Sequence, residues 1–136
     1  INVLDAIKNL NPKAIFIVTN QGGIEKGLFP ESFIYVKCEY VNDSIMDYCD
    51  INTRFMYCGS NDRNNPMRKP NTGMLEELFN NYKSWNDGLS EKDCLMIGDA
   101  SGLEGQFSDS DKKTAENFGI DYMDVSEFVN IYGKGV

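Results

Sequence analysis

The sequence contains 136 residues with a formal net charge of −8, and 41% of its residues are hydrophobic. This length suits a single domain with its own core, and the acidic balance argues against a broad nucleic-acid-binding face, because non-specific affinity comes mainly from lysine and arginine on phosphates. No apolar run approaches the length of a membrane span and no signal-peptide pattern opens the chain, so we expect no membrane partner. Four scattered cysteines without C-x-x-C spacing suggest buried thiols in a reducing cytoplasm, with a disulfide as the alternative.

A helix and a buried strand are predicted at the start of the chain. Apolar residues recur at helical spacing over residues 1–10, and Asn11-Pro12 ends that pattern. A strand is predicted over residues 14–19, where a continuous run of five apolar residues ends at Thr19 and Asn20. Such a run is typical of a strand buried on both faces of a parallel sheet, with a short buried helix as the alternative.

Helical and extended patterns continue to alternate through the middle of the chain. The apolar residues of 32–49 recur at helical spacing, and residues 54–58 form a weaker strand candidate. A polar loop over 59–70 precedes an apolar stripe on residues 74–82, which predicts a helix that begins just after Pro70.

The last third repeats the alternation. Residues 94–97 are a second buried strand, ended by Gly98-Asp99, and a helix is predicted over 111–118. A short strand over 121–123 precedes Asp124, which has capping-box spacing to Glu127 at the start of a last helix. Strands that alternate with helices in this way predict an α/β fold with a parallel sheet.

Three polar features should meet at one edge of this sheet. Thr19-Asn20 and Asp99 each end a strand, and Lys69 precedes a helix, so the three should converge in a crevice at the carboxyl ends of the strands. A hydroxyl, a cation and a carboxylate suit a phosphate held beside Mg²⁺. The plainer alternatives are a turn at Thr19-Asn20 and at Gly98-Asp99 and a solvated lysine; Asp109 and Asp111 flank a helix start, where aspartate is also favoured for capping.

The order of these residues resembles the haloacid dehalogenase-type phosphatase superfamily. Residues 18–24 (VTNQGGI) are similar to its second motif, residues 68–74 (RKPNTGM) to its third, and residues 97–99 (IGD) to its fourth. Within the superfamily, the R-K-P-x-[ST]-G-M run, a G-D-A-x-G turn at 98–102 and an F-S-x-x-D segment at 107–111 resemble the phosphatase domain of polynucleotide kinase 3′-phosphatases. The resemblance covers nearly the whole chain, residues 1–136 as one domain.

This resemblance implies a fold, a cofactor and site roles. The fold would be a Rossmann-like three-layer sandwich with a mostly parallel sheet, and the interval between Thr19 and Lys69 leaves no room there for a large cap domain. Thr19 and the backbone of Asn20 would bind phosphoryl oxygens, and Lys69 would stabilise the charge of the nucleophile and the transferring group. Asp99 would hold Mg²⁺, with Asp111 as a direct or indirect partner.

Two departures from the superfamily pattern matter. Related histidinol-phosphate and heptose-bisphosphate phosphatases carry a Cys/His zinc loop before the R-K-P run, whereas residues 58–67 contain one cysteine, Cys58, and the chain has no histidine. This argues against those subfamilies and against zinc. The first motif, D-x-D-G-T, which carries the nucleophilic aspartate, is absent, and Asp5 lacks the second aspartate. We expect an upstream strand with that motif, since its loss would expose apolar sheet edges.

Three hypotheses for function follow. The first is a Mg²⁺-dependent phosphomonoesterase that forms an aspartyl-phosphate and acts on a phosphorylated substrate such as a DNA 3′ end. The second is a small-metabolite phosphatase of the histidinol-phosphate or heptose-bisphosphate type. The third is a non-catalytic phosphate-binding domain; a response-regulator receiver is disfavoured, because its acids precede the Thr and Lys, whereas Asp99 follows both.

Overall fold

The computed structural model describes residues 2–133. Its elements follow one another in the order α1 (Asn2–Leu10), β1 (Ile15–Asn20), α2 (Glu31–Cys49), β2 (Thr53–Cys58), α3 (Gly73–Lys83), the 3₁₀ turn η1 (Glu91–Asp93), β3 (Leu95–Gly98), α4 (Ser110–Phe118), β4 (Asp121–Asp124) and α5 (Val125–Tyr132). Each predicted helix and strand is present, and its bounds lie within two residues of the predicted ones. The 3₁₀ turn was not predicted; Ser90 and Asp93 close it with a reciprocal capping box.

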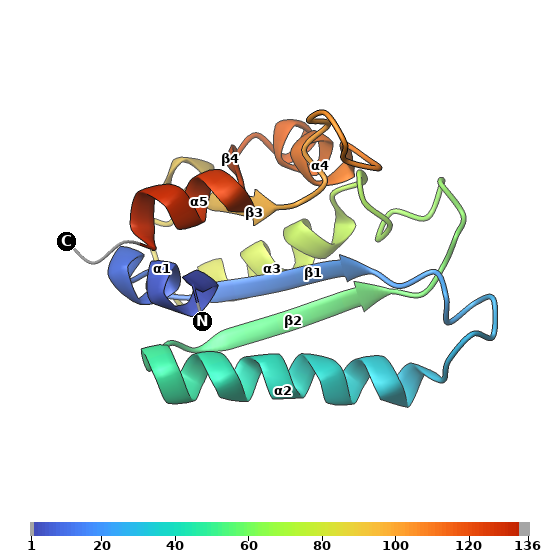
Figure 1. Cartoon of the computed structure of the whole chain (residues 1–136), viewed down its shortest axis with the longest axis horizontal. Coiled ribbons are helices and arrows are strands. Elements are labelled where there is room, and N and C mark those ends of the chain that lie inside the picture. Colours follow the sequence, from blue (N-terminus) through green and yellow to red (C-terminus); the bar gives the residue numbers. More distant parts are fainter. Residues whose placement is uncertain (1, 134–136) are drawn as a thin grey trace.

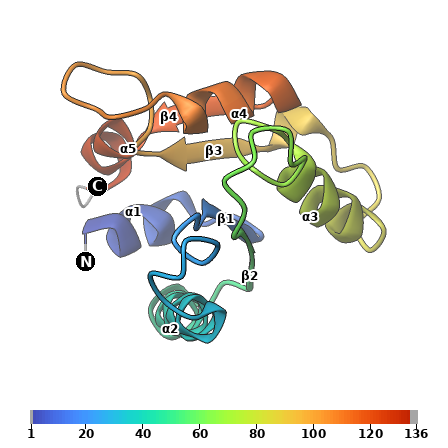
Figure 2. The same cartoon turned by 90° about the vertical axis from the view of Figure 1, so that its right-hand side faces the viewer.

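The strands form two parallel pairs. β1 pairs with β2 from Ile15 opposite Thr53 to Asn20 opposite Cys58, and β3 pairs with β4 from Leu95 opposite Asp121 to Gly98 opposite Asp124. The α/β architecture with parallel strands is therefore confirmed, but within residues 2–133 no backbone ladder joins the two pairs. In Figures 1 and 2, β1 and β3 are the strands on the facing sides of these two sheets.

Helices cover both pairs. α2 packs along β2, and α3 packs on β1 and β2 from another side, whereas α4 and α5 pack against β3 and β4. α1 lies against α2 and α5 at the end of the molecule where the strands begin (Figure 1). α2 and α4 each end in a left-handed residue, Asp50 and Gly119, and Asn11 after α1 also has a positive φ. Within residues 2–133, no helix has both the length and the apolar character that a membrane crossing needs.

The main core cluster joins the two strand pairs. Leu75 of α3, Met96 of β3 and Ala115 of α4 form it, and Val18 of β1 packs against it from the other pair. Burial of these side chains is the favourable term that brings the two halves together.

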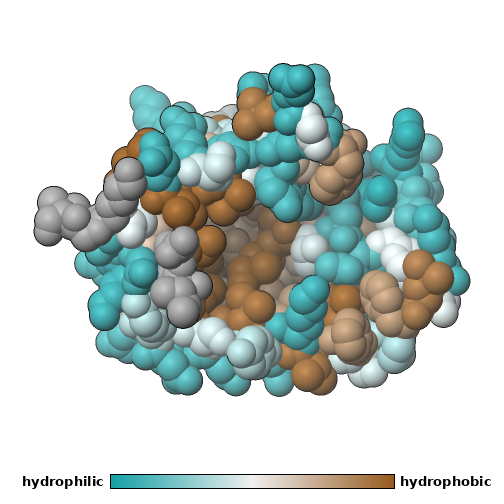
Figure 3. Space-filling model, in the orientation of Figure 1, coloured by the Kyte–Doolittle hydropathy of each residue, from teal (hydrophilic) through white to brown (hydrophobic). Residues whose placement is uncertain are grey.

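The prediction that the first strand is buried on both faces is wrong. Every residue of β1 is only half-buried, and the same holds for the second predicted buried strand, β3, except at Met96. The reason is that β1 is hydrogen-bonded on one edge alone, so its other edge has no strand beside it in the described part of the chain. Figure 3 shows that the face between the two halves is hollowed and that its walls are mainly apolar.

Candidate active site

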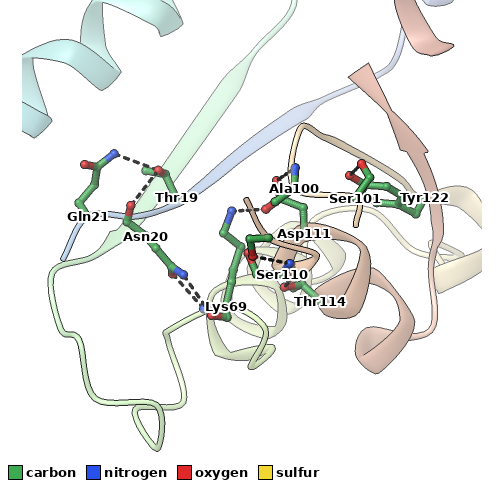
Figure 4. Close-up of polar contacts among 11 residues, drawn as sticks. Thr19, Asn20, Gln21, Lys69, Ala100, Ser101, Ser110, Asp111, Thr114 and Tyr122 are labelled. Carbon is green, nitrogen blue, oxygen red and sulfur yellow. Dashed lines mark hydrogen bonds and ion pairs between the residues drawn. The ribbon is translucent and has the colours of Figure 1, made fainter. Parts of the chain in front are cut away.

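The carboxyl ends of β1 and β3 point to the same end of the molecule as the loop before α3 (Figures 1 and 4). Thr19 and Asn20 are the last residues of β1, and Asp99 directly follows β3. Lys69 lies in the loop before α3, bonded to Asn20 through its backbone and to Asp111, the acceptor of the Ala100 N–H, through its side chain. The predicted convergence of the three strand-end and loop features therefore exists in the structure.

Asn20 and Lys69 are joined by two hydrogen bonds between the Asn20 side chain and the Lys69 backbone. The Lys69 N–H donates to Asn20 Oδ1 at 2.9 Å, and Asn20 Nδ2 donates to the Lys69 carbonyl at 3.1 Å. Both backbone groups of the lysine are thus satisfied by one amide side chain. This pair fixes the lysine backbone against the end of β1, and only the lysine side chain is left to reach elsewhere.

That side chain reaches Asp111 in the first turn of α4. Lys69 Nζ lies 2.5 Å from Asp111 Oδ1, and the two side chains are 11% and 9% exposed. The other carboxylate oxygen, Oδ2, accepts a hydrogen bond from the Ala100 N–H at 3.1 Å. A buried ion pair is held well when its remaining oxygen is also satisfied, as it is in this pair. The contacts thus run without a break from β1 through Lys69 and Asp111 to the residue after Asp99 (Figure 4).

Gly98 is required at the end of β3 by close packing. A Cβ at this position would lie 2.5 Å from Asp111 Oδ2 and 2.8 Å from Asp111 Cβ, which real side chains do not tolerate. Asp111 can therefore approach the strand end only because residue 98 has no side chain. This close approach of Asp111 explains the glycine at position 98.

Thr19 is held in a polar cluster at the end of β1. Its Oγ1 accepts a hydrogen bond from Gln21 Nε2 at 3.0 Å, and the Gln21 N–H donates to the Cys58 carbonyl at 2.7 Å. The next residue, Gly22, packs against Asn61, whose Nδ2 donates to the Gly22 carbonyl at 2.9 Å. A Cβ on Gly22 would overlap Asn61 Oδ1, so the loop after Thr19 is also closely packed.

The three predicted aspartates have different surroundings. Asp99 is exposed, whereas both oxygens of buried Asp111 are engaged by Lys69 and Ala100. Asp109 is exposed and occupies the N-cap position of α4, but its side chain makes no capping hydrogen bond. Asp109 therefore stands at the expected position before the helix, but the expectation that its side chain caps the helix is wrong.

The carboxylates at the site bear on whether it could hold a metal. Within residues 2–133, no group of three or more His, Cys, Asp and Glu side chains is arranged to hold an ion. Mg²⁺ is nevertheless commonly bound through one or two carboxylates, with water and phosphate oxygens completing the octahedron. The exposed carboxylate of Asp99 fits that requirement as one ligand, and Asp111 is better placed to hold Lys69.

Sequence reasoning missed three contributors. The Asn20 side chain orients Lys69, whereas the sequence predicted a role only for the Asn20 backbone; Ala100 supplies an N–H to Asp111. Gln106 accepts from two N–H groups of the 99–109 segment and donates to Asp124. No local pattern marks these contacts, because each joins residues brought together by the tertiary fold. Asp124 does cap α5 as predicted, with its carboxylate accepting from the Ser126 N–H at 2.9 Å.

Known proteins share sequence similarity with this chain. The family model described as "Polynucleotide kinase 3 phosphatase" matches residues 1–129. A relative named "Probable D-glycero-D-manno-heptose-1,7-bisphosphate 7-phosphatase", from Thermoplasma volcanium, is 30% identical over 95 residues, 69% of this chain and 62% of the relative. "Histidine biosynthesis bifunctional protein HisB" from Legionella pneumophila is 29% identical over 117 residues, 82% of this chain and 28% of the relative.

These matches bear on the predictions in two ways. The matched part spans less than two thirds of the length of either curated relative. The superfamily prediction is confirmed, whereas the two relatives carry names of the subfamilies that the absence of a zinc loop argued against. No solved structure matches the chain. Because the family model covers all but the last seven of the 136 residues, the chain belongs to the polynucleotide kinase 3 phosphatase family, within the haloacid dehalogenase-type phosphatases.

Proposed function

We propose that this protein is a Mg²⁺-dependent phosphomonoester hydrolase that works through an aspartyl-phosphate. The observation that carries the proposal is the run of contacts from Asn20 through Lys69 and Asp111 to Ala100. It connects the three stretches that resemble the second, third and fourth motifs of this superfamily. It also holds an ammonium group rigidly between two strand ends, which is an arrangement suited to a transferring phosphoryl group.

The nucleophile in this proposal comes from a strand that precedes Ile1. The support is the edge of β1 that pairs with no strand within residues 2–133, the half-burial of its side chains and the hollowed apolar face between the two strand pairs. A strand seated between β1 and β3 would pair with both and bury that face. Its carboxyl end would then lie beside Thr19, Lys69 and Asp99.

The reaction has two displacements at phosphorus. In the first, the aspartate oxygen bonds to phosphorus, the bond to the leaving-group oxygen breaks, and that oxygen takes a proton from a neighbouring acid. In the second, water bonds to phosphorus, gives up a proton to the same acid and releases the aspartate with inorganic phosphate. Thr19 Oγ1 and the backbone N–H groups after β1 bind phosphoryl oxygens. Lys69 Nζ offsets their negative charge, with Asp111 holding the ammonium in place.

Asp99 would hold the metal together with the nucleophile and a phosphoryl oxygen. When bound, Mg²⁺ supplies positive charge that neutralises the phosphoryl oxygens and the attacking carboxylate. The role of Asp111 follows from its contacts, which position Lys69 and the turn at Ala100. Its carboxylate would also contribute negative charge near a bound metal.

The proposed substrate is a phosphorylated polynucleotide end, a DNA 3′-phosphate. The family model that matches nearly the whole chain supports it, and the interval between β1 and α3 contains only one helix and one strand. The net charge of −8 limits any contact with nucleic acid to the local site. The second candidate is a small sugar or amino-alcohol phosphate, which the names of the two curated relatives favour.

The upstream strand gives the first prediction. The sequence that precedes Ile1 in the gene should contain a buried-strand pattern that ends in D-x-D-G-T or D-x-D-G-S. Reading the gene upstream is the measurement. If the first position of that motif holds a residue other than aspartate, the hydrolase proposal is wrong and a non-catalytic phosphate-binding domain is favoured.

The substrate class can be decided by one panel of assays. Phosphate release by the full-length protein with Mg²⁺ should be fastest from a 3′-phosphorylated oligonucleotide, and slower from the same oligonucleotide phosphorylated at its 5′ end. Heptose 1,7-bisphosphate and histidinol phosphate test the second candidate. A higher kcat/KM on either metabolite would replace the polynucleotide proposal, and no release from any of the four would argue against hydrolysis.

Lys69→Met should lower kcat about 100-fold or more, since the loss of one preorganised cationic contact costs about 3 kcal/mol in the transition state. It should also lower stability, because buried Asp111 loses its partner. The double variant Lys69→Met/Asp111→Asn should regain stability but not activity, which separates the two effects. The control is Lys112→Met, an exposed lysine of the same helix as Asp111. Activity of Lys69→Met within a few-fold of the parent would show that Lys69 has no catalytic role.

The three aspartates should separate in a Mg²⁺ titration of the phosphatase rate. Asp99→Asn should do the most damage and should raise the half-saturating Mg²⁺ concentration, because it removes charge from a metal ligand. Asp111→Asn should lower the phosphatase rate by an intermediate amount, mainly through kcat, because Asp111 holds Lys69 in place. Exposed Asp109→Asn should do little. If Asp109→Asn is the most damaging, the assignment of the 107–111 segment is shifted.

A further inference from the structure

The segment between β3 and α4, which we call the 99–109 loop, is closed by one glutamine side chain. Gln106 Oε1 accepts hydrogen bonds from the backbone N–H groups of Ser101 at 2.8 Å and Leu103 at 3.1 Å. Its Nε2 donates to Asp124 Oδ2 at 2.8 Å. All the polar capacity of this amide except one N–H is thus used to hold the loop on itself and on the end of β4.

Asp124 is buried, 8% exposed, and its two oxygens have separate partners. Oδ1 accepts from the N–H and the hydroxyl of Ser126, in the first turn of α5. Oδ2 accepts from Ser101 Oγ at 2.6 Å and from Gln106 Nε2, both of which belong to the 99–109 loop. Ser101 Oγ also lies 2.5 Å from the Tyr122 hydroxyl (Figure 4). Since Ser101 has one hydroxyl proton and gives it to Asp124, the tyrosine is the donor to Ser101.

These donors keep the carboxylate charged. The hydrogen bonds from Ser101, Ser126 and Gln106 hold the pKa of Asp124 well below its usual range. A charged acceptor makes each of these hydrogen bonds stronger than a neutral one would be. A helix cap needs only the Oδ1 half of this arrangement, so the Oδ2 half has no role in α5.

The loop that Oδ2 holds bears directly on the candidate site. It begins at Asp99 and contains Ala100, whose N–H bonds to Asp111 and whose carbonyl accepts from the Asp111 and Lys112 N–H groups. Ser101, the next residue, bonds to Asp124. Ala100, which orients Asp111, is therefore one position from the anchored Ser101, and the candidate metal ligand Asp99 is two positions from it. A shift of the loop would move both.

We propose that Gln106 and the Oδ2 side of Asp124 are positioning residues, which fix the 99–109 loop so that Asp99 and Asp111 lie correctly for the metal and for Lys69. This inference rests on the proposed phosphatase function. It extends that function to two residues, Gln106 and Asp124, that none of the matched motifs includes. Neither residue touches the phosphate or the metal; both act through the loop backbone.

Gln106 and Ser126 donate to different oxygens of the Asp124 carboxylate. Substituting each one in turn gives a pair of variants that can be compared. Gln106→Ala removes a donor to Oδ2 and frees the N–H groups of Ser101 and Leu103. Ser126→Ala removes a hydroxyl donor to Oδ1 and leaves the loop contacts intact. Both would be made in the full-length protein. The readouts are kcat, the half-saturating Mg²⁺ concentration, the melting temperature and amide hydrogen exchange over residues 99–110.

Gln106→Ala should raise the half-saturating Mg²⁺ concentration and lower kcat, each by about tenfold, the scale on which partners one shell out from a metal act. Amide exchange over residues 99–110 should become faster. Ser126→Ala should lower the melting temperature by several degrees, with kcat and the Mg²⁺ dependence within twofold of the parent. The proposal would be overturned if Ser126→Ala changed kcat and the half-saturating Mg²⁺ concentration more than Gln106→Ala does, or if the two variants changed them equally.

The exchange measurement keeps the two proposals apart. If the parent releases no phosphate from any substrate, the proposed function has failed, and unchanged exchange in Gln106→Ala would then reject the positioning role as well. If the parent is active and Gln106→Ala lowers only the melting temperature, the hydrolase stands and the positioning role is wrong.

Discussion

The ion pair between Lys69 and Asp111 is the interaction on which the site depends. Its two members come from different halves of the molecule: Lys69 is bound to the end of β1, and Asp111 belongs to the helix that packs on β3 and β4. Two charges taken out of water cost free energy unless geometry and additional hydrogen bonds compensate. Ala100 supplies the additional bond, and Gly98 supplies the space. The ion pair therefore requires a glycine at position 98 and a backbone N–H at Ala100 that faces Asp111.

Alternating patterns predicted most of the fold, because local rules decide helices and strands. Helical spacing of apolar residues marked α2 and α3, and the left-handed residues Asp50 and Gly119 stop α2 and α4. The parallel pairing followed from the alternation of strands and helices. The convergence of Thr19, Lys69 and Asp99 followed in turn from the rule that parallel strands end at one edge.

Contacts between distant residues could not be predicted in this way. Nothing in the neighbourhood of Asn20 says that its amide will hold the backbone of Lys69, 49 positions later. Asp111 carries the features of an ordinary helix-start acid, and only the tertiary structure gives it a lysine partner. The half-burial of β1 is a further example. A run of apolar residues shows how hydrophobic a strand is, but it does not show how many strands pair with it.

The contact between the first and last helices has a practical consequence. α1 packs on α5, with Asn9 donating to the Tyr132 carbonyl at 2.6 Å, at the end of the molecule where the strands begin. Thr19, Lys69 and Asp99 lie at the opposite end. Fluorophores or a surface linker attached to exposed positions of α1 or α5 would thus sit near each other and face away from the polar cluster. A protein immobilised through either attachment would present that cluster to solution, as kinetic and binding measurements on a sensor surface require.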